Sequence, residues 1–534
     1  MAASDGTTAG EEFDHIIVGA GSAGCVIARR LVDAGRKVAL VEAGGPDTNP
    51  AIHDPLRAWE LWNSQEDWAY LTEPQEHSLK TSLSWPRGKV LGGSSALNGM
   101  IYIRGAKADF DNWAYNGAAG WSYDQVLPFF KKSEDFEEGA SHYHGAGGPL
   151  PVTRIREPNP ASLAFLEACA GYGVPLNDDP NADSILGAGL THLTVRNGRR
   201  MSAWTSFVQP VLDSPLLTVI TGAQVARLVF DGTGRAAGVR LAGTGRVLSS
   251  RTYAADSTAA PASVEWPALE LRCSGDVIVC GGTIGSPQLL LLSGIGPAAQ
   301  LRDCGINLVA DLPGVGEQLQ DHPFVMACYA APAPLRPSAY NHGETYAALR
   351  SPLAGDWPDL HLFPILLPLA TGGRQAPDGG FALVASAVGV ASRGTVRLAS
   401  ADPEAAPLID PRFLTEAADL NRLEAGLGII RHAVADAAMA PLGISETWPG
   451  PGTCDSAGLR DWIRHSVGSY WHPAGTCRMG TDDGAVTDPQ LRVHGIAGLR
   501  VADASVMPAI PNAPLHATVL AVAEKAAALI TGAP

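Results

Sequence analysis

A glycine-rich turn near the N-terminus is the sequence feature that most restricts the fold. The apolar run FDHIIV (residues 13–18) leads into GAGSAG, in which Gly19, Gly21 and Gly24 have GxGxxG spacing. A segment with helical periodicity follows, and then a second apolar run, KVALVEAG, which contains Glu42. The first two glycines allow a tight turn and close backbone approach, and the third allows the helix to pack on the strand. The pattern predicts a βαβ unit.

The chemistry of this unit indicates dinucleotide binding. The N-terminus of the helix offers backbone amides and a partial positive charge to a pyrophosphate. Glu42 is placed to accept hydrogen bonds from the ribose of an adenosine, and its carboxylate disfavours the 2′-phosphate of NADP. The unit alone does not show whether the dinucleotide is FAD or NAD.

Length and charge limit the other possibilities. A chain of 534 residues is too long for one hydrophobic core, so we expect two domains. The net charge of −16 argues against nucleic acid or an anionic membrane surface as the main partner. Glycines and a proline interrupt the most apolar window, residues 276–296, so no integral membrane segment is predicted.

The cysteines and the N-terminal residues favour a cytoplasmic protein. Eight cysteines are scattered, with no CxxC pair and no histidine spacing typical of zinc. We therefore expect reduced thiols and no metal site. The first 15 residues lack a basic start and an apolar stretch, so no secretory signal is predicted.

Two further blocks extend the pattern. They are WPRGKVLGGSSALNGMIYIRG (residues 85–105) and GGTIGSPQLLLLSGIG (residues 281–296), and LRVADASVMP follows towards the C-terminus. Together with the N-terminal unit, the chain resembles the glucose–methanol–choline (GMC) oxidoreductases from residue 13 to about residue 530, and it is most similar to their choline-dehydrogenase-like and alcohol-oxidising branches. The resemblance implies an α/β fold class (α+β overall): a Rossmann-like FAD-binding domain and a discontinuous substrate domain built on an antiparallel sheet with helices.

The resemblance also implies domain boundaries and a set of cofactor residues. The FAD-binding domain is expected over residues 1–155, 205–310 and 460–534, and the substrate-binding domain over residues 156–204 and 311–459. Leu97 stands where some family members carry a histidine that bonds FAD covalently, so we expect non-covalent FAD. The expected FAD-binding residues are Gly19, Gly21, Ser22, Ala23, Gly24, Glu42, Ala43, Gly92, Gly93, Asn98, Gly99, Met100, Ile101, Val225, Trp471, Asp503 and Ala504.

His472 is the expected catalytic base. It lies in SYWHPAGTCRMG, where Pro473 restricts the backbone beside it. A neutral imidazole near an alcohol can take the hydroxyl proton while a hydride leaves the carbon for the flavin. A buried structural histidine is the alternative for such a residue taken alone, and the resemblance favours the base.

A second polar residue of the site is expected just before the C-terminal helix. The family's usual slot falls on Pro514, so the candidates are His516, slightly preferred, and Asn512. Asn512 also suits an N-cap with Pro514 in the first helical turn, and His516 also suits a contact with the flavin or the backbone. The N-terminus of this helix is expected to face the flavin and stabilise its reduced, negative form.

These features predict FAD-dependent oxidation of a small primary alcohol, aliphatic or aryl, to the aldehyde, with O2, a quinone or another carrier as electron acceptor. A hydroxynitrile lyase on the same scaffold and a nicotinamide-dependent enzyme are the alternatives. His142, His144 and His361 are considered as pocket residues, although an exposed or structural role is favoured for each. Residues 249–267 are predicted to form a surface insert.

Overall fold

A mostly parallel sheet forms one half of the protein. The computed structural model describes residues 12–78, 82–248, 264–266, 269–370, 374–453 and 455–533. The sheet has the order β17 (Val264–Trp266), β16 (Gly245–Leu248), β13 (Leu217–Thr221), β3 (Val38–Val41), β2 (His15–Val18), β19 (Val277–Val279) and β30 (Leu499–Val501). The five strands from β13 to β30 run parallel, and β16 pairs antiparallel with β13. The predicted insert lies outside the described residues except for β17.

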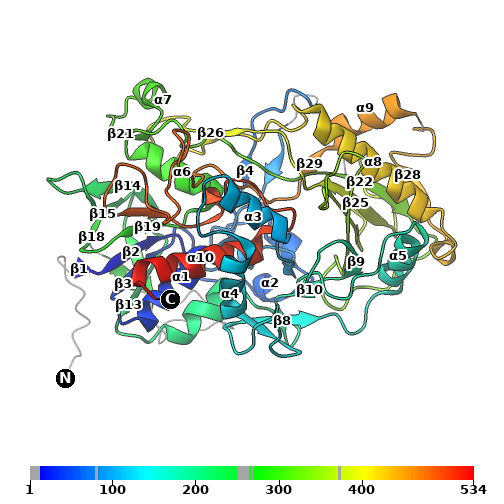
Figure 1. Ribbon diagram of the computed structural model, residues 1–534, viewed down its shortest axis with the longest axis horizontal. Coiled ribbons are helices and arrows are strands. Elements are labelled where there is room, and N and C mark those ends of the chain that lie inside the picture. Colours follow the sequence, from blue (N-terminus) through cyan, green and yellow to red (C-terminus); the bar gives the residue numbers. More distant parts are fainter. Residues whose placement is uncertain are drawn as a thin grey trace.

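The predicted βαβ unit is confirmed at the centre of this sheet. Strand β2 enters α1 (Ser22–Asp33), and β3 pairs parallel with β2. Ile16 and Ile17 of β2 and all four residues of β3 are buried, as their continuous hydrophobic runs require in a sheet covered on both faces. Helix α10 (Leu515–Thr531) packs against α1 and α4 (Tyr123–Ser133), and Figure 1 shows it in red beside the parallel sheet.

An antiparallel sheet forms the other half, towards the right of Figure 1. Its order is β28 (Ser445–Trp448), β22 (Pro323–Ala330), β25 (Phe381–Ala387), β24 (Leu360–Ile365), β23 (Thr345–Leu349) and β9 (Gly187–Leu190), with β29 (Gly468–Ser469) also on β22. Helices α5 (Pro160–Gly171), α8 (Ala417–Val434) and α9 (Ser456–Ser466) accompany it, and α8 packs on the sheet through a second hydrophobic core. The predicted fold class is confirmed, and the exact domain boundaries stay a prediction.

Two smaller sheets flank the large ones. One has the order β1 (Glu12–Phe13), β18 (Glu270–Cys273), β15 (Ala236–Leu241) and β14 (Val225–Phe230), and contains the hairpin β14–β15. The other has the order β6 (Ile101–Tyr102), β10 (His192–Leu193), β8 (Leu150–Arg154) and β7 (Glu134–Phe136).

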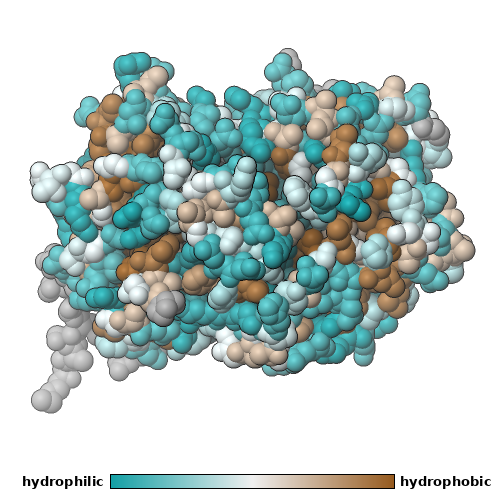
Figure 2. Space-filling model, in the orientation of Figure 1, coloured by the Kyte–Doolittle hydropathy of each residue, from teal (hydrophilic) through white to brown (hydrophobic). Residues whose placement is uncertain are grey.

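The surface is largely polar on the face that Figure 2 shows, where hydrophilic residues outnumber interspersed hydrophobic ones. Most of the buried apolar residues belong to two hydrophobic cores, one at each of the two large sheets. In the described part of the chain, none of the helices has the length and apolar character needed to cross a bilayer.

A buried ion pair joins the helices of the first half, and its loss should destabilise the fold. Arg30 on α1 binds both oxygens of Glu524 on α10, at 2.8 and 2.7 Å, and the Glu524 side chain is fully buried. Replacing Arg30 leaves this carboxylate without its closest cation, so Arg30→Met should lower the free energy of unfolding by about 3 kcal/mol in denaturant titrations of the FAD-loaded protein.

The neighbouring Arg29 provides the control. It pairs with Asp33 at the helix surface, where solvent screens the pair, so Arg29→Met should cost about 0.5 kcal/mol or less. Equal losses in the two variants would contradict the importance of the buried pair.

Candidate active site

A cavity of about 680 Å³ lies where the two halves meet. On one side it is lined by Val18, Val41 and Val279, which end strands β2, β3 and β19. On the other side it is lined by residues of the antiparallel sheet, including Phe324 and Phe363. The carboxyl ends of parallel strands are the usual place for a ligand in a sheet of this kind.

Two glycine loops meet backbone to backbone at one end of the cavity. Gly19 has φ +101°, which favours glycine, and a Cβ atom on Gly24 would lie 1.9 Å from the Gly19 carbonyl oxygen. A Cβ atom on Gly93 would lie 2.7 Å from the Cα atom of Gly21. Side chains are thereby excluded between the loop after β2 and the loop of residues 88–93, which leaves backbone amides to face a pyrophosphate.

Glu42 lies beside the first loop as predicted. Its carboxylate accepts hydrogen bonds from the backbone amides of Ala20 and Gly44, both at 2.8 Å. Burial raises its pKa to about 7, although these amides favour the charged form. The side chain lines the cavity, where the ribose of a dinucleotide is expected.

Most of the predicted cofactor residues line this cavity. Gly24 and Gly92 are the exceptions: Gly24 packs on the strand–helix turn, and Gly92 lies against Ser202 and Ser95. The arrangement of the residues that do line the cavity fits a dinucleotide, and the individual contacts of these residues with FAD stay a prediction. The lining residues from the predicted set are Gly19, Gly21, Ser22, Ala23, Glu42, Ala43, Gly93, Asn98, Gly99, Met100, Ile101, Val225, Trp471, Asp503 and Ala504.

Two of these residues are held by protein contacts that the sequence analysis did not foresee. Asp503 accepts hydrogen bonds from the backbone amides of Gly282 and Ser505, both at 2.8 Å, and from the Ser286 hydroxyl at 2.5 Å. Asn98 accepts a hydrogen bond from Arg200 Nη1 at 2.7 Å. Arg200 is buried, and no motif in the sequence marks it.

His472 lines the cavity in a segment with a strained backbone. The preceding residue, Trp471, has φ +60°, a conformation uncommon for residues other than glycine. Arg87 Nη2 donates to the Trp471 carbonyl at 2.7 Å, and the His472 amide donates to Asp321 Oδ1 at 2.8 Å. These bonds stabilise the conformation in which the imidazole reaches the cavity.

A second histidine lies against His472. The Nδ1 atoms of His472 and His322 are 3.1 Å apart, and the two rings are perpendicular. The pKa of His472 lies well below its usual range because the ring is buried, with further contributions from His322 and Arg87. At neutral pH the imidazole is therefore uncharged and able to accept a proton. His322 was not among the predicted site residues.

The region before α10 differs in part from the expectation. The helix begins at Leu515 with Pro514 as its N-cap residue, so the alternative that Asn512 caps the helix is wrong. The Asn512 side-chain amide donates to the Pro358 carbonyl at 2.7 Å, and Asn512 does not line the cavity. His516 does line it, with Nδ1 3.2 Å from the Ser22 hydroxyl, and burial lowers its pKa to about 4.

Apart from polar residues such as Asn341 and His342, the remaining wall of the cavity is largely aromatic and aliphatic. Trp62 and Phe324 pack against Trp471, and Phe363 stacks on Tyr470. Among the lining residues that the structure describes, the acidic ones are Glu42 and Asp503, both at the dinucleotide end. His142, His144 and His361 are not part of this lining.

Comparisons with known proteins agree with this geometry. The GMC oxidoreductase N-terminal family model matches residues 13–324, and the C-terminal model matches residues 390–523. An "Oxygen-dependent choline dehydrogenase" of Brucella melitensis is 36% identical over 98% of this chain and 96% of its own length. An "Alcohol dehydrogenase [acceptor]" of Pseudomonas putida is 36% identical over 97% of this chain and 95% of its own length.

A solved structure shows the same fold. The pyridoxine 4-oxidase from "Mesorbium loti" has a TM-score of 0.87 and 33% identity, over 97% of this chain and 98% of that one. The family models cover more than half of the chain, and the relatives match almost all of it. The chain therefore belongs to the GMC oxidoreductases and is an FAD-dependent enzyme that acts on alcohols.

Proposed function

We propose that the enzyme oxidises small neutral primary alcohols, aliphatic or aryl, to aldehydes, with His472 as the base. The observation that carries this proposal is the position of His472: a buried, uncharged imidazole on the wall of a cavity with a dinucleotide end and an aromatic end. A group in this position can contact both the cofactor and an alcohol held by the aromatic wall.

Separate groups of residues hold the cofactor and take part in the reaction. The two glycine loops and Glu42 hold the dinucleotide, and the N-terminus of α10, whose Leu515 and His516 line the cavity, adds a partial positive charge. FAD, when bound, supplies the acceptor for the hydride that leaves the alcohol carbon. Leu97, which stands at the position where some family members carry the histidine of covalent attachment, lines the cavity, and this supports non-covalent FAD.

His322 determines which nitrogen of His472 is the base. The Nδ1 atom of His472 is occupied by the contact with His322. The Nε2 atom of His472 is therefore the one that takes the hydroxyl proton. Nε2 can do so only in the tautomer in which His472 Nδ1 carries the hydrogen and donates to His322 Nδ1. His322 is therefore a positioning residue, and the tautomer it selects keeps the lone pair of His472 towards the substrate.

The wall of the cavity favours neutral substrates. Trp62, Phe324 and Phe363 offer apolar contact, and the acidic lining residues lie at the dinucleotide end. Arg87, which also lines the cavity, brings a positive charge next to Trp471. A quaternary ammonium such as choline, the substrate in the names of several relatives, would have aromatic faces to bind it but, among the described lining residues, no carboxylate beside them.

Removal of the base should abolish most catalysis and leave cofactor binding intact. His472→Ala is expected to retain FAD and to lower the rate of anaerobic flavin reduction by about 10²–10⁴-fold, because the hydroxyl proton has no acceptor. Stopped-flow absorbance measures this rate. His465→Ala, at an exposed histidine on α9, is the control and should reduce at the rate of the unchanged enzyme. An unchanged rate in His472→Ala would refute the assignment.

Two substitutions at His322 should separate its positioning role from simple packing. His322→Phe removes the acceptor for His472 Nδ1 and should lower the reduction rate by about tenfold or more, with little change in the Kd for the alcohol. His322→Asn offers a side-chain oxygen in a similar place and should restore most of the rate. Equal rates in the two variants would show that His322 only fills space.

Substrate choice can be read from flavin bleaching without oxygen. Benzyl alcohol and 1-butanol should bleach the flavin with a second-order rate constant, the limiting rate of flavin reduction divided by Kd, about tenfold or more above that of choline, a difference of about 1.4 kcal/mol or more. A preference for choline would contradict the neutral substrate, and no bleaching with any alcohol would favour the lyase alternative. Mixing the reduced enzyme with oxygen or a quinone then identifies the electron acceptor.

A further inference from the structure

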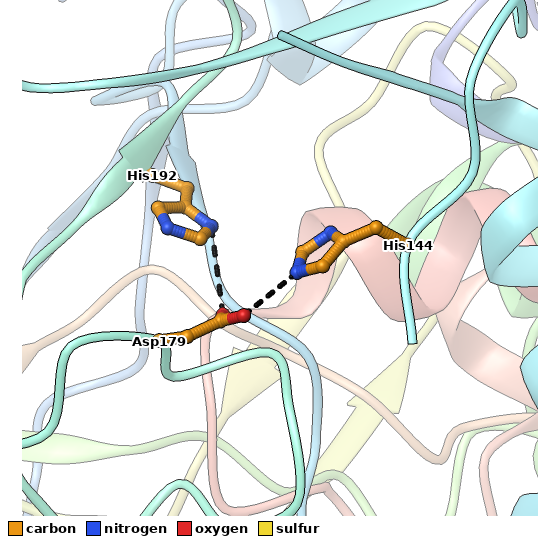
Figure 3. A group of neighbouring side chains, drawn as sticks. All are labelled: His144, Asp179 and His192. Atoms are coloured by element: carbon orange, nitrogen blue, oxygen red, sulfur yellow. Dashed lines mark hydrogen bonds and ion pairs between the residues drawn. The ribbon is translucent and has the colours of Figure 1, made fainter. Parts of the chain in front are cut away.

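Three side chains from separate segments converge outside the cavity. His144 lies between β7 and β8, Asp179 lies in the loop between α5 and β9, and His192 belongs to β10. Figure 3 shows both imidazoles pointing towards the Asp179 carboxylate. His144 and His192 are buried, with exposed fractions of 3% and 1%, and the Asp179 side chain is 26% exposed.

The three groups offer ligand atoms of the kind that zinc binds. His144 Nε2 is 2.9 Å from Asp179 Oδ2, His192 Nδ1 is 4.0 Å from Asp179 Oδ1, and the three ligand atoms lie within 4.8 Å of one another. Zinc binds imidazole nitrogen and carboxylate oxygen at about 2.0–2.2 Å, so two ligand atoms of a tetrahedral site lie about 3.3 Å apart. Side-chain shifts of about 1 Å would therefore bring the group to that geometry.

The surroundings of His144 resemble the outer shell of a metal site. Its other ring nitrogen, Nδ1, is 3.0 Å from Glu134 Oε1, and Glu134 Oε2 accepts hydrogen bonds from Arg104 at 2.9 Å and the Gly145 amide at 2.7 Å. A histidine that binds a metal usually donates its second N–H to such a carboxylate, which orients the ring and directs the other nitrogen to the ion.

The aromatic ring of Phe136 completes the wall. It stacks on His144 with ring centroids 3.9 Å apart, and its centroid is 5.1 Å from that of His192. This packing restricts both imidazoles before any ion binds, and the partly exposed Asp179 leaves a side open to solvent. A water molecule can therefore reach the fourth position of a tetrahedral ion.

We propose that His144, Asp179 and His192 form a binding site for one divalent transition-metal ion, with Zn²⁺ as the best match. Two imidazoles and one carboxylate suit zinc better than calcium or magnesium, which prefer oxygen ligands alone. The ion would replace two present contacts: the His144–Asp179 hydrogen bond and the one that Asn181 Nδ2 donates to His192 Nδ1 at 3.0 Å. Asn181 would keep its bond to the Tyr102 carbonyl.

Metal titration of the FAD-loaded enzyme tests this site. After treatment with a chelator, the protein is titrated with Zn²⁺ in a calorimeter, and Co²⁺ is added separately to detect the absorption bands of a four-coordinate ion beyond the flavin spectrum. One ion per chain should bind, and saturating Zn²⁺ should raise the Tm because it binds the folded protein alone. Failure to bind either ion stoichiometrically would overturn the proposal.

Variants locate the ion. His144→Ala and His192→Ala should each weaken Zn²⁺ binding at least about tenfold and remove the Co²⁺ bands. Exposed His142, two residues from His144, provides the matched control, and His142→Ala should bind as the unchanged protein does. Asp179→Asn keeps the side-chain shape and should also weaken Zn²⁺ binding. It serves as the test if the alanine variants lose FAD. Unchanged binding in Asp179→Asn, or equal weakening in His142→Ala, would place the ion elsewhere.

Discussion

The contact between two glycine loops is the constraint on which the rest of the site depends. Gly93 approaches Gly21 so closely that a single added carbon would collide with the backbone. This contact fixes residues 88–93 over the start of α1, although 54 residues, 34–87, separate them from the end of that helix. The chain that leaves the second loop then passes along the cavity through Asn98 and Ile101 into β6. The surface expected to face the pyrophosphate is thus built from backbone, and its shape tolerates little substitution.

Burial has a different consequence at the catalytic end. Removing His472 from water disfavours its charged form, and His322 and Arg87 act in the same direction. An uncharged base can approach an apolar substrate wall without the large cost of burying an ion. The strained Trp471 backbone is held by Arg87 on its carbonyl and by the Ser469 hydroxyl on its amide, the latter at 2.7 Å. The surrounding hydrogen bonds thus offset the strain that directs the imidazole into the cavity.

Local patterns made part of this structure predictable. The βαβ unit and the restricted backbone of His472 beside Pro473 each depend on neighbouring residues. The sequence did not indicate His322, because it is 150 residues from His472 and lies beside it through tertiary contacts such as the pairing of β22 with β29. The expectation that Asn512 caps the helix failed for a local reason. Pro514 is itself the residue before the first helical turn, so α10 starts at Leu515, two residues later than an Asn512 cap would place it, and the Asn512 side-chain amide donates to the Pro358 carbonyl.

The sequence did not indicate the group of His144, Asp179 and His192 either, because its members are far apart along the chain. The intervals between them, 35 and 13 residues, match no zinc motif. Its place in the fold nevertheless links it to the cavity. His192 pairs with Tyr102 in the sheet, and Leu193 pairs with Ile101, which lines the cavity. Asn181, two residues from Asp179, bonds to the Tyr102 carbonyl and to the Arg104 amide. An ion that restrains Asp179 would therefore also restrain the strand that forms one wall of the cavity.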